Sequence, residues 1–227
     1  MASGTIQISK IAAAQRQLDA AIRMFFQRED DLPIHTIAAA AFQILRDLTK
    51  NRGGHFSKEV FRSGILSIAQ QYVAGTLPPN TKAVIEGSDL LPVIEELAEQ
   101  MRVQGHNFDK EHIQVNVSEE REHKIWLSEI TVFLKHANRD PDGFLSANRL
   151  DNEKMLMATC AAYLELMKQP TWEIVAYFAF WAVKNHQVSD LTEQAQQFAR
   201  QLEAAHEMQR HEMCAKFIRD NKTKGLP

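Results

Sequence analysis

The most hydrophobic stretch of this 227-residue chain is TWEIVAYFAFWAVK, from Thr171 to Lys184. Its uninterrupted apolar run, Ile174 to Val183, has ten residues, whereas a helix needs about 20 to cross the hydrocarbon core of a bilayer. A helix that is apolar on most of its sides belongs inside a protein core. Thr171 is the expected N-cap. The stretch therefore predicts a central buried helix over 172–184, covered by other helices.

Apolar residues along most of the chain recur at intervals of three and four, the period of an amphipathic helix. The pattern predicts an all-α fold, namely a single globular domain over residues 1–227 with about seven helices. The last of these is expected to be one long helix that begins after Ser189 or Asp190 and continues to about residue 220.

The helix expected over residues 33–52 contains an unusual run of alanines, Ala38 to Ala41. Small side chains let two helix backbones approach closely, so this helix is predicted to be central. Pro33 is expected to open it, because proline is tolerated in the first position of a helix.

Residues 105–118 interrupt the helical pattern. Ile113, Val115 and Val117 alternate as in a strand. Because one isolated strand is unstable, an extended linker is preferred to a strand. The same segment is the possible boundary if the chain forms two lobes. One domain is favoured over two lobes because each lobe alone would be small.

Charge and cysteine content limit the functional classes. The net charge is −3 and the pI is about 6.3, which argues against a broad nucleic-acid-binding face. The two cysteines, Cys160 and Cys214, lie among apolar neighbours and are expected to be buried thiols in a reducing compartment. The first residues lack the pattern of a signal peptide. These features predict a cytoplasmic protein without a membrane segment.

Familiar cofactor and metal motifs fail on their spacing. His206 and His211 are five residues apart and, on one helix, would point roughly 140° away from each other, so they could not share a metal. The segment Asp140–Gly143 resembles a turn more than a calcium loop, because the later ligands of an EF-hand are absent. The chain contains no phosphate-binding glycine motif. Neither a metal nor a cofactor is expected.

One polar segment stands out, FLKHANRDPD at residues 133–142. It places cations at the expected end of a helix, where the helix dipole favours them. His35 lies in the first turn of another expected helix, an end that attracts anions. If the two ends meet, they form a ligand site; two unrelated helix ends are the simpler interpretation. The candidate ligand-binding residues are His35, Lys135, His136, Arg139 and Asp140.

The strings IHTIAAAAFQILRDL (Ile34–Leu48) and FLKHANRDPD (Phe133–Asp142) resemble a family of uncharacterised helical proteins in bacteria. That resemblance implies a helical fold and names no activity. More distantly, the layout is similar to HEPN-like domains, helical modules that are often dimeric and include RNases with an Arg-x4–6-His motif. Arg28–His35 and Arg200–His206 have this spacing, but a chain with nine histidines produces it by chance.

These observations leave three functional hypotheses, and whether the chain is an enzyme stays open. The first is a helical domain without catalysis that binds a protein or a small ligand. Such a domain could be a homodimer, with the aromatic side chains of 172–184 in either the core or the interface. The second is a small enzyme with a site near His35 and His136. The third is a HEPN-like RNase with the same histidines.

Overall fold

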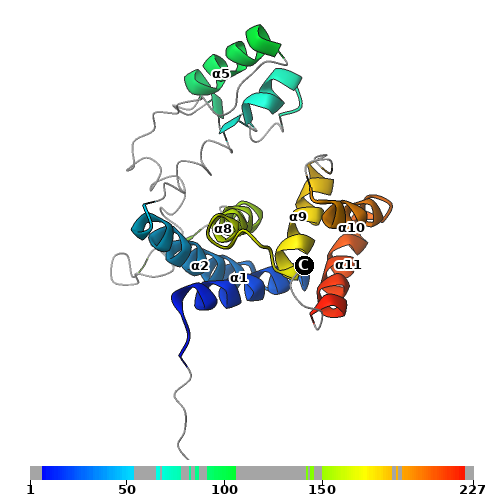
Figure 1. Cartoon of the computed structure of the whole chain (residues 1–227). Helices are drawn as coiled ribbons and strands as arrows, with labels where there is room; N and C mark the ends of the chain where they lie inside the picture. Colours follow the sequence, from blue (N-terminus) through cyan, green and yellow to red (C-terminus); the bar gives the residue numbers. More distant parts are fainter. Residues whose placement is uncertain are drawn as a thin grey trace, which may run out of the picture. The chain divides into compact units, whose positions relative to one another are not determined.

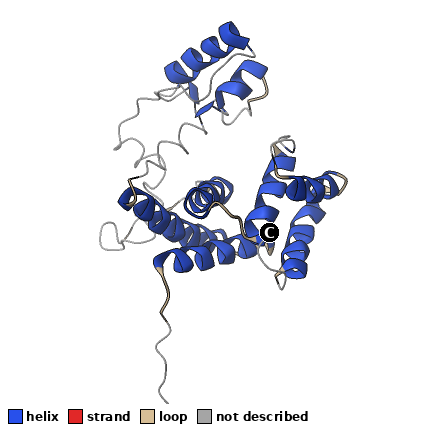
Figure 2. Cartoon of the chain, in the orientation of Figure 1, coloured by secondary structure: helices blue, strands red, loops and turns tan. Residues whose placement is uncertain are grey.

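The computed structural model describes residues 7–53, 65–66, 68–77, 82, 85–86, 91–105, 142, 144–145, 150–185, 188 and 191–222. The regular structure within these ranges is entirely helical, which confirms the predicted all-α class (Figure 2). The chain divides into two compact units. Unit 1 comprises Met1–Gly54 and Leu127–Pro227, and unit 2 comprises His55–Trp126. Whether residues 1–227 form a single domain, or two lobes divided at residues 105–118, stays a prediction.

Unit 1 contains a pair of antiparallel helices, α1 and α2, and a second group formed around α9 (Figure 1). Helix α2 packs on α1 and α8, while α9 packs on α10 and α11. Helix α1 also contacts α8, α9 and α11, so it joins the two groups. The bounds are α1 (Lys10–Phe26), α2 (Asp31–Asn51), α8 (Asn152–Met167), α9 (Trp172–Lys184), α10 (Glu193–Glu203) and α11 (Glu207–Asn221).

Helix α9 is the buried helix that the sequence predicts. Ten of its 13 residues are buried, and Ile174 and Tyr177 are completely enclosed. Thr171 is its N-cap, and the Thr171 hydroxyl accepts a hydrogen bond from the backbone N–H of Ile174 at 3.3 Å. At its other end, Lys184 binds both carboxylate oxygens of Glu153 on α8, at 2.6 and 2.7 Å. None of the described helices is long and apolar enough to cross a membrane.

The alanines of α2 allow α8 to come close to it. Ala38 and Ala41 are fully buried. Thr159 on α8 donates its hydroxyl hydrogen bond to the backbone oxygens of Met155 in its own helix and Ala38 in α2, at 2.7 and 3.3 Å. A short threonine side chain reaches a neighbouring backbone only if the two helices nearly touch. The predicted close approach at the alanine run is therefore confirmed.

The predicted start of α2 at Pro33 is wrong by two residues. The helix begins at Asp31, and Asp30 is its N-cap, with a side-chain oxygen that accepts from the N–H of Leu32 at 2.8 Å. An aspartate satisfies an exposed N–H at a helix start, and proline is accommodated within the first turn because the N–H groups there have no partner inside the helix. The N-cap Asp30, and not Pro33, therefore determines where α2 begins.

The prediction of one long final helix is also wrong. Helix α10 ends at Glu203 and α11 begins at Glu207, with His206 as N-cap in an extended conformation. The break allows Phe198 and Phe217 to stack, with ring centroids 4.0 Å apart. On a continuous helix these two residues would lie about 28 Å apart. Aromatic packing against α9 and between α10 and α11 therefore outweighs helix continuity.

Unit 2 has its own small apolar core. Helix α5 (Leu91–Gln104) packs with the helical residues 68–74, and Gly105 at φ +54° follows its end. The linker or strand proposed from Ile113, Val115 and Val117 falls outside the described residues. The buried core residues are Ile65, Ala69, Ile85, Ile94 and Leu97.

The close contact of α2 with α8 gives the first prediction. Replacing Ala38 with leucine forces a larger side chain into a filled contact, so Ala38→Leu should lower the free energy of unfolding by about 1–3 kcal/mol. Urea denaturation followed by circular dichroism measures this change. Lys50→Leu, at an exposed position of the same helix, is the control, and an equal loss from both variants would refute the close-contact explanation.

Candidate functional site

His35, the described member of the predicted site, is engaged in the packing of α2 on α8. Its side chain is buried, and Nδ1 lies 3.2 Å from Oδ1 of Asn152. The Asn152 amide nitrogen donates to the backbone oxygen and a carboxylate oxygen of Asp31, at 3.1 and 2.9 Å. Burial lowers the pKa of His35 from its usual 6.5, against a smaller opposing effect of the Asn152 hydrogen bond. These contacts link the starts of α2 and α8.

The other predicted site residues, Lys135, His136, Arg139 and Asp140, lie outside the described residues. The convergence of His35 with this segment therefore stays a prediction. His35 already forms a side-chain hydrogen bond with Asn152, which follows the segment in sequence. This contact agrees with the simpler interpretation that His35 belongs to the structure of a helix end.

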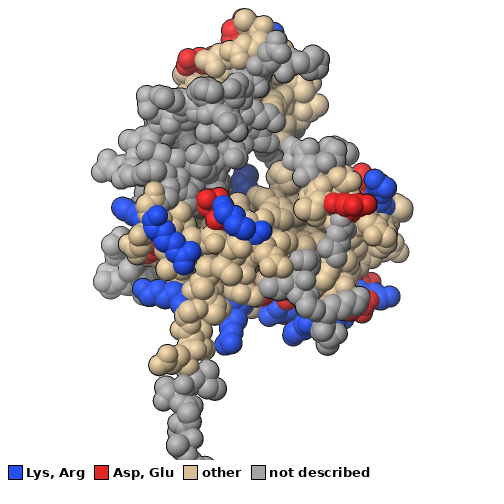
Figure 3. Space-filling model, in the orientation of Figure 1, with Lys and Arg blue, Asp and Glu red and all other residues tan. Residues whose placement is uncertain are grey.

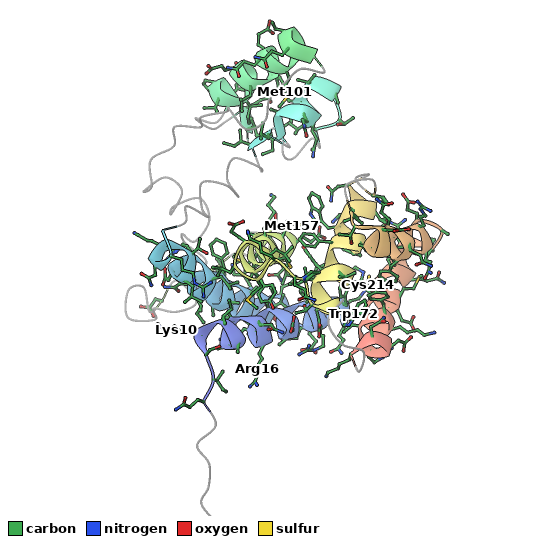
Figure 4. The ribbon with its side chains drawn as sticks, viewed as in Figure 1. Lys10, Arg16, Met101, Met157, Trp172 and Cys214 are labelled. Atoms are coloured by element: carbon green, nitrogen blue, oxygen red, sulfur yellow. The ribbon has the colours of Figure 1, made fainter. Side chains whose placement is uncertain are left out.

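A different set of side chains lines an open hollow at the start of α9. The hollow has a volume of about 270 Å³. Helix α1 supplies one wall, and the first residues of α9 together with the end of α11 supply the rest (Figure 4). In Figure 4, Arg16 projects from the outer side of α1, and Trp172 lies where α9 begins. We call this hollow the α1–α9 pocket; it is lined by Gln15, Arg16, Asp19, Arg23, Thr171, Trp172, Glu173 and Lys222.

The carboxylate of Glu173 is neutralised by Arg23. Arg23 Nη1 lies 2.5 Å from Glu173 Oε1, and the Glu173 side chain is only 10% exposed. A nearly buried carboxylate requires such a partner, because its removal from water is unfavourable. Within the pocket, Glu173 and Arg23 therefore act as a pair with little net charge.

The surroundings of the second carboxyl group, Asp19, raise its pKa and make it easier to protonate. Its Oδ1 accepts a hydrogen bond from the Thr171 hydroxyl at 2.8 Å. Burial, followed by the nearby Glu173 charge, raises the pKa of Asp19 from 3.8 to about 6, even though the Thr171 hydrogen bond and Arg23 oppose this shift. Asp19 therefore changes its protonation state at about pH 6.

Two cations complete the lining of the pocket. Arg16 and Lys222 are both exposed. Among the described residues, neither has an ion-pair partner, whereas Arg23 is bound to Glu173. Figure 3 shows the Lys and Arg side chains, with Asp and Glu side chains among them, on one face of unit 1. Arg16 and Lys222 therefore give the pocket lining two basic side chains that no described carboxylate neutralises.

His211, on α11, lies in a separate aromatic cluster. Its ring centroid is 5.3, 6.0 and 4.8 Å from those of Phe25, Phe26 and Phe180. Nδ1 is buried without a hydrogen-bond partner among the described residues. Burial first, and then the charge of Arg28, lowers the pKa of His211. Three aromatic rings already pack against this histidine, so we assign it to the packing of α11.

The two histidines of α11 and its N-cap, His211 and His206, lie in different surroundings. His206 is the exposed N-cap of α11, where Nδ1 accepts from the Met208 N–H at 3.4 Å. In the described part of the chain, no group of three or more His, Cys, Asp or Glu side chains could hold a metal ion. Cys160 and Cys214 are buried free thiols, as predicted, and Cys214 lies 3.9 Å from the Ala176 carbonyl oxygen.

Comparison with known proteins adds no constraint: no family model, curated protein or solved structure matches this chain. The resemblance to a helical bacterial family and the HEPN-like layout therefore stay predictions from the residues quoted above. The candidate site consequently depends on the geometry of the pocket.

Sequence reasoning did not identify Asp19 or Glu173, although each carries a signal. Asp19 directly follows Leu18, a fully buried residue of α1, and Glu173 lies inside the buried face of α9. A charged residue at the edge of an apolar stripe is usually a solvated position, so the pattern alone does not single it out. Only the packing of α1 against the start of α9 brings the two carboxyl groups together.

The state of Asp19 predicts a distinctive pH dependence. Because the folded pKa is raised, the folded protein holds a proton between about pH 4 and about pH 6 that the unfolded chain has released. The contribution of protonated Asp19 to the free energy of unfolding is complete below this window and is lost as the pH rises through about 6. The unfolding free energy of Asp19→Asn relative to wild type should therefore increase with pH across the window.

Urea denaturation of both proteins at several pH values measures this difference. The wild-type values must be subtracted because His35 and His211 also make the stability depend on pH. Their pKa values are lowered in the folded protein, so both histidines reduce the free energy of unfolding as the pH falls below about 6.5. The effect of Asp19 has the opposite sign, since it reduces the free energy of unfolding as the pH rises. Asp47→Asn, at an exposed carboxylate of α2, is the matched control. A flat difference for Asp19→Asn would show that Asp19 keeps its ordinary pKa.

The Asn152 network gives a second prediction for this region. Asn152→Ala removes the partner of a buried imidazole and the link to Asp31, so it should cost about 1–3 kcal/mol of stability. Thermal or urea unfolding measures the loss. Asp151→Asn, which changes the neighbouring N-cap but retains a capping group, is the control; a similar loss in both variants would assign the effect to the start of α8 in general.

Proposed function

We propose that this chain is a helical domain that acts by binding a small ligand in the α1–α9 pocket, without catalysis of its own. The observation that carries the proposal is the pocket itself, an open hollow of about 270 Å³ with charged side chains converging from α1, α9 and α11. Ligand sites combine a concave shape with a few polar groups in fixed positions. Here the Arg23–Glu173 pair and the Thr171–Asp19 hydrogen bond fix two of those groups.

The pocket supports binding better than the predicted site at His35. His35 is only 6% exposed, and its Nδ1 is engaged by Asn152. Arg16 and Lys222 are exposed and border a hollow that a small molecule can enter. We include cytoplasmic residence in this proposal, because both cysteines are buried free thiols. Homodimer formation is a separate expectation that light scattering at several protein concentrations tests.

A ligand screen by NMR tests the proposed function. Small cations, neutral polar molecules and small anions are added separately to ¹⁵N-labelled protein, and amide shifts are mapped on the sequence. We expect at least one class to move the resonances of residues 15–23 and 171–173 together. Arg16→Gln should reduce these shifts, while Lys154→Gln, on an exposed ion pair of α8, should not. Shifts confined to other regions, or none in any class, would refute binding at this pocket.

A further inference from the structure

We propose that the ligand of the α1–α9 pocket is a small dianion, such as a dicarboxylate or an inorganic oxyanion, and that Asp19 takes up a proton when it binds. This inference rests on the proposed function, since it names the ligand class of the same site. It depends on three features of the pocket: unpaired cations, a carboxyl group in a protonatable position, and the start of a helix.

The cations favour an anionic ligand. Arg16 and Lys222 enter the lining from α1 and α11, and neither is paired with a described carboxylate. Unpaired basic groups at a concave surface attract anions and hold them through charge-assisted hydrogen bonds. An ammonium ligand would meet these two like charges, because Glu173 is already bound to Arg23.

The charge balance favours two negative charges. With Asp19 protonated, the lining has three basic side chains, Arg16, Arg23 and Lys222, and one ionised acid, Glu173. Two positive charges therefore remain. With Asp19 ionised only one remains, and its carboxylate repels the ligand. Binding of a dianion consequently favours the neutral carboxylic acid, which can donate a hydrogen bond to a ligand oxygen.

The start of α9 also favours a negatively charged ligand. Thr171, its N-cap, lines the pocket, and the 13-residue helix begins at Trp172. The positive end of the helix dipole stabilises negative charge near the first turn. The dimensions limit the ligand to a compact molecule, since about 270 Å³ lies below the range of about 300–1,000 Å³ for sites of drug-sized ligands.

Calorimetry with three probes tests the inference. Sulfate stays a dianion across the pH range and represents inorganic oxyanions, fumarate represents dicarboxylates, and dimethyl sulfone is a neutral molecule of similar shape to sulfate. At constant ionic strength, sulfate or fumarate should bind about 25-fold more tightly at about pH 5.5 than at about pH 7.5, because the pocket with protonated Asp19 is the form that binds the dianion and the pKa of Asp19 is about 6. Binding should be accompanied by proton uptake. Dimethyl sulfone should not bind.

Variants separate the roles of the side chains. Arg16→Gln and Lys222→Gln, both at exposed positions where folding is not at risk, should each weaken dianion binding about fivefold. Asp19→Asn should bind without proton uptake and with little dependence on pH. Arg102→Gln, on an exposed ion pair in unit 2, is the matched control and should bind like wild type.

The outcomes distinguish this inference from the proposed function. If neither dianion binds while a cation or neutral molecule shifts the pocket resonances, the ligand class is wrong and the pocket remains a binding site. If dianion binding is independent of pH or insensitive to Arg16→Gln and Lys222→Gln, the proposed coupling or location is wrong. If no class of molecule binds at the pocket, both proposals fail.

Discussion

Helix α9 presents apolar side chains around its axis and must be covered on most of its sides. Burying each large apolar side chain contributes about 1.5–3 kcal/mol, so the cover is the main source of stability in this part of unit 1. Helices α10 and α11 pack against α9, and α1 contacts it while also packing on α2. The chain therefore breaks between α10 and α11, because a straight helix could not cover α9 in this way.

The polar pocket is a consequence of the same constraint. A buried helix must still begin somewhere, and its first N–H groups need partners. Thr171 satisfies one of them and also binds Asp19 of α1, while Glu173 extends to Arg23 of α1. The start of α9 thus places two carboxyl groups at the edge of the core, where burial affects their protonation. The site and the packing of the fold are physically connected.

The helical class, the buried helix over 172–184 and the close packing at Ala38 followed from periodicity and side-chain size. The error at Pro33 arose because a good N-cap, Asp30, lies further upstream. The error in the final helix arose because periodicity does not show when a helix turns back to stack Phe198 on Phe217. The pocket could not be predicted for a similar reason, since Asp19 and Glu173 are 154 positions apart in sequence and meet only through packing.

The short break before α11 also affects local motion. Among the residues of α11, only Cys214 and Ile218 are buried, whereas ten residues of α9 are. Helices with few buried contacts open at lower free energy than the core, without global unfolding. Because Lys222 follows the end of α11 and lines the pocket, such opening would remove one wall of the site. Amide hydrogen exchange near the end of α11 therefore measures how often the side of the pocket formed by Lys222 opens.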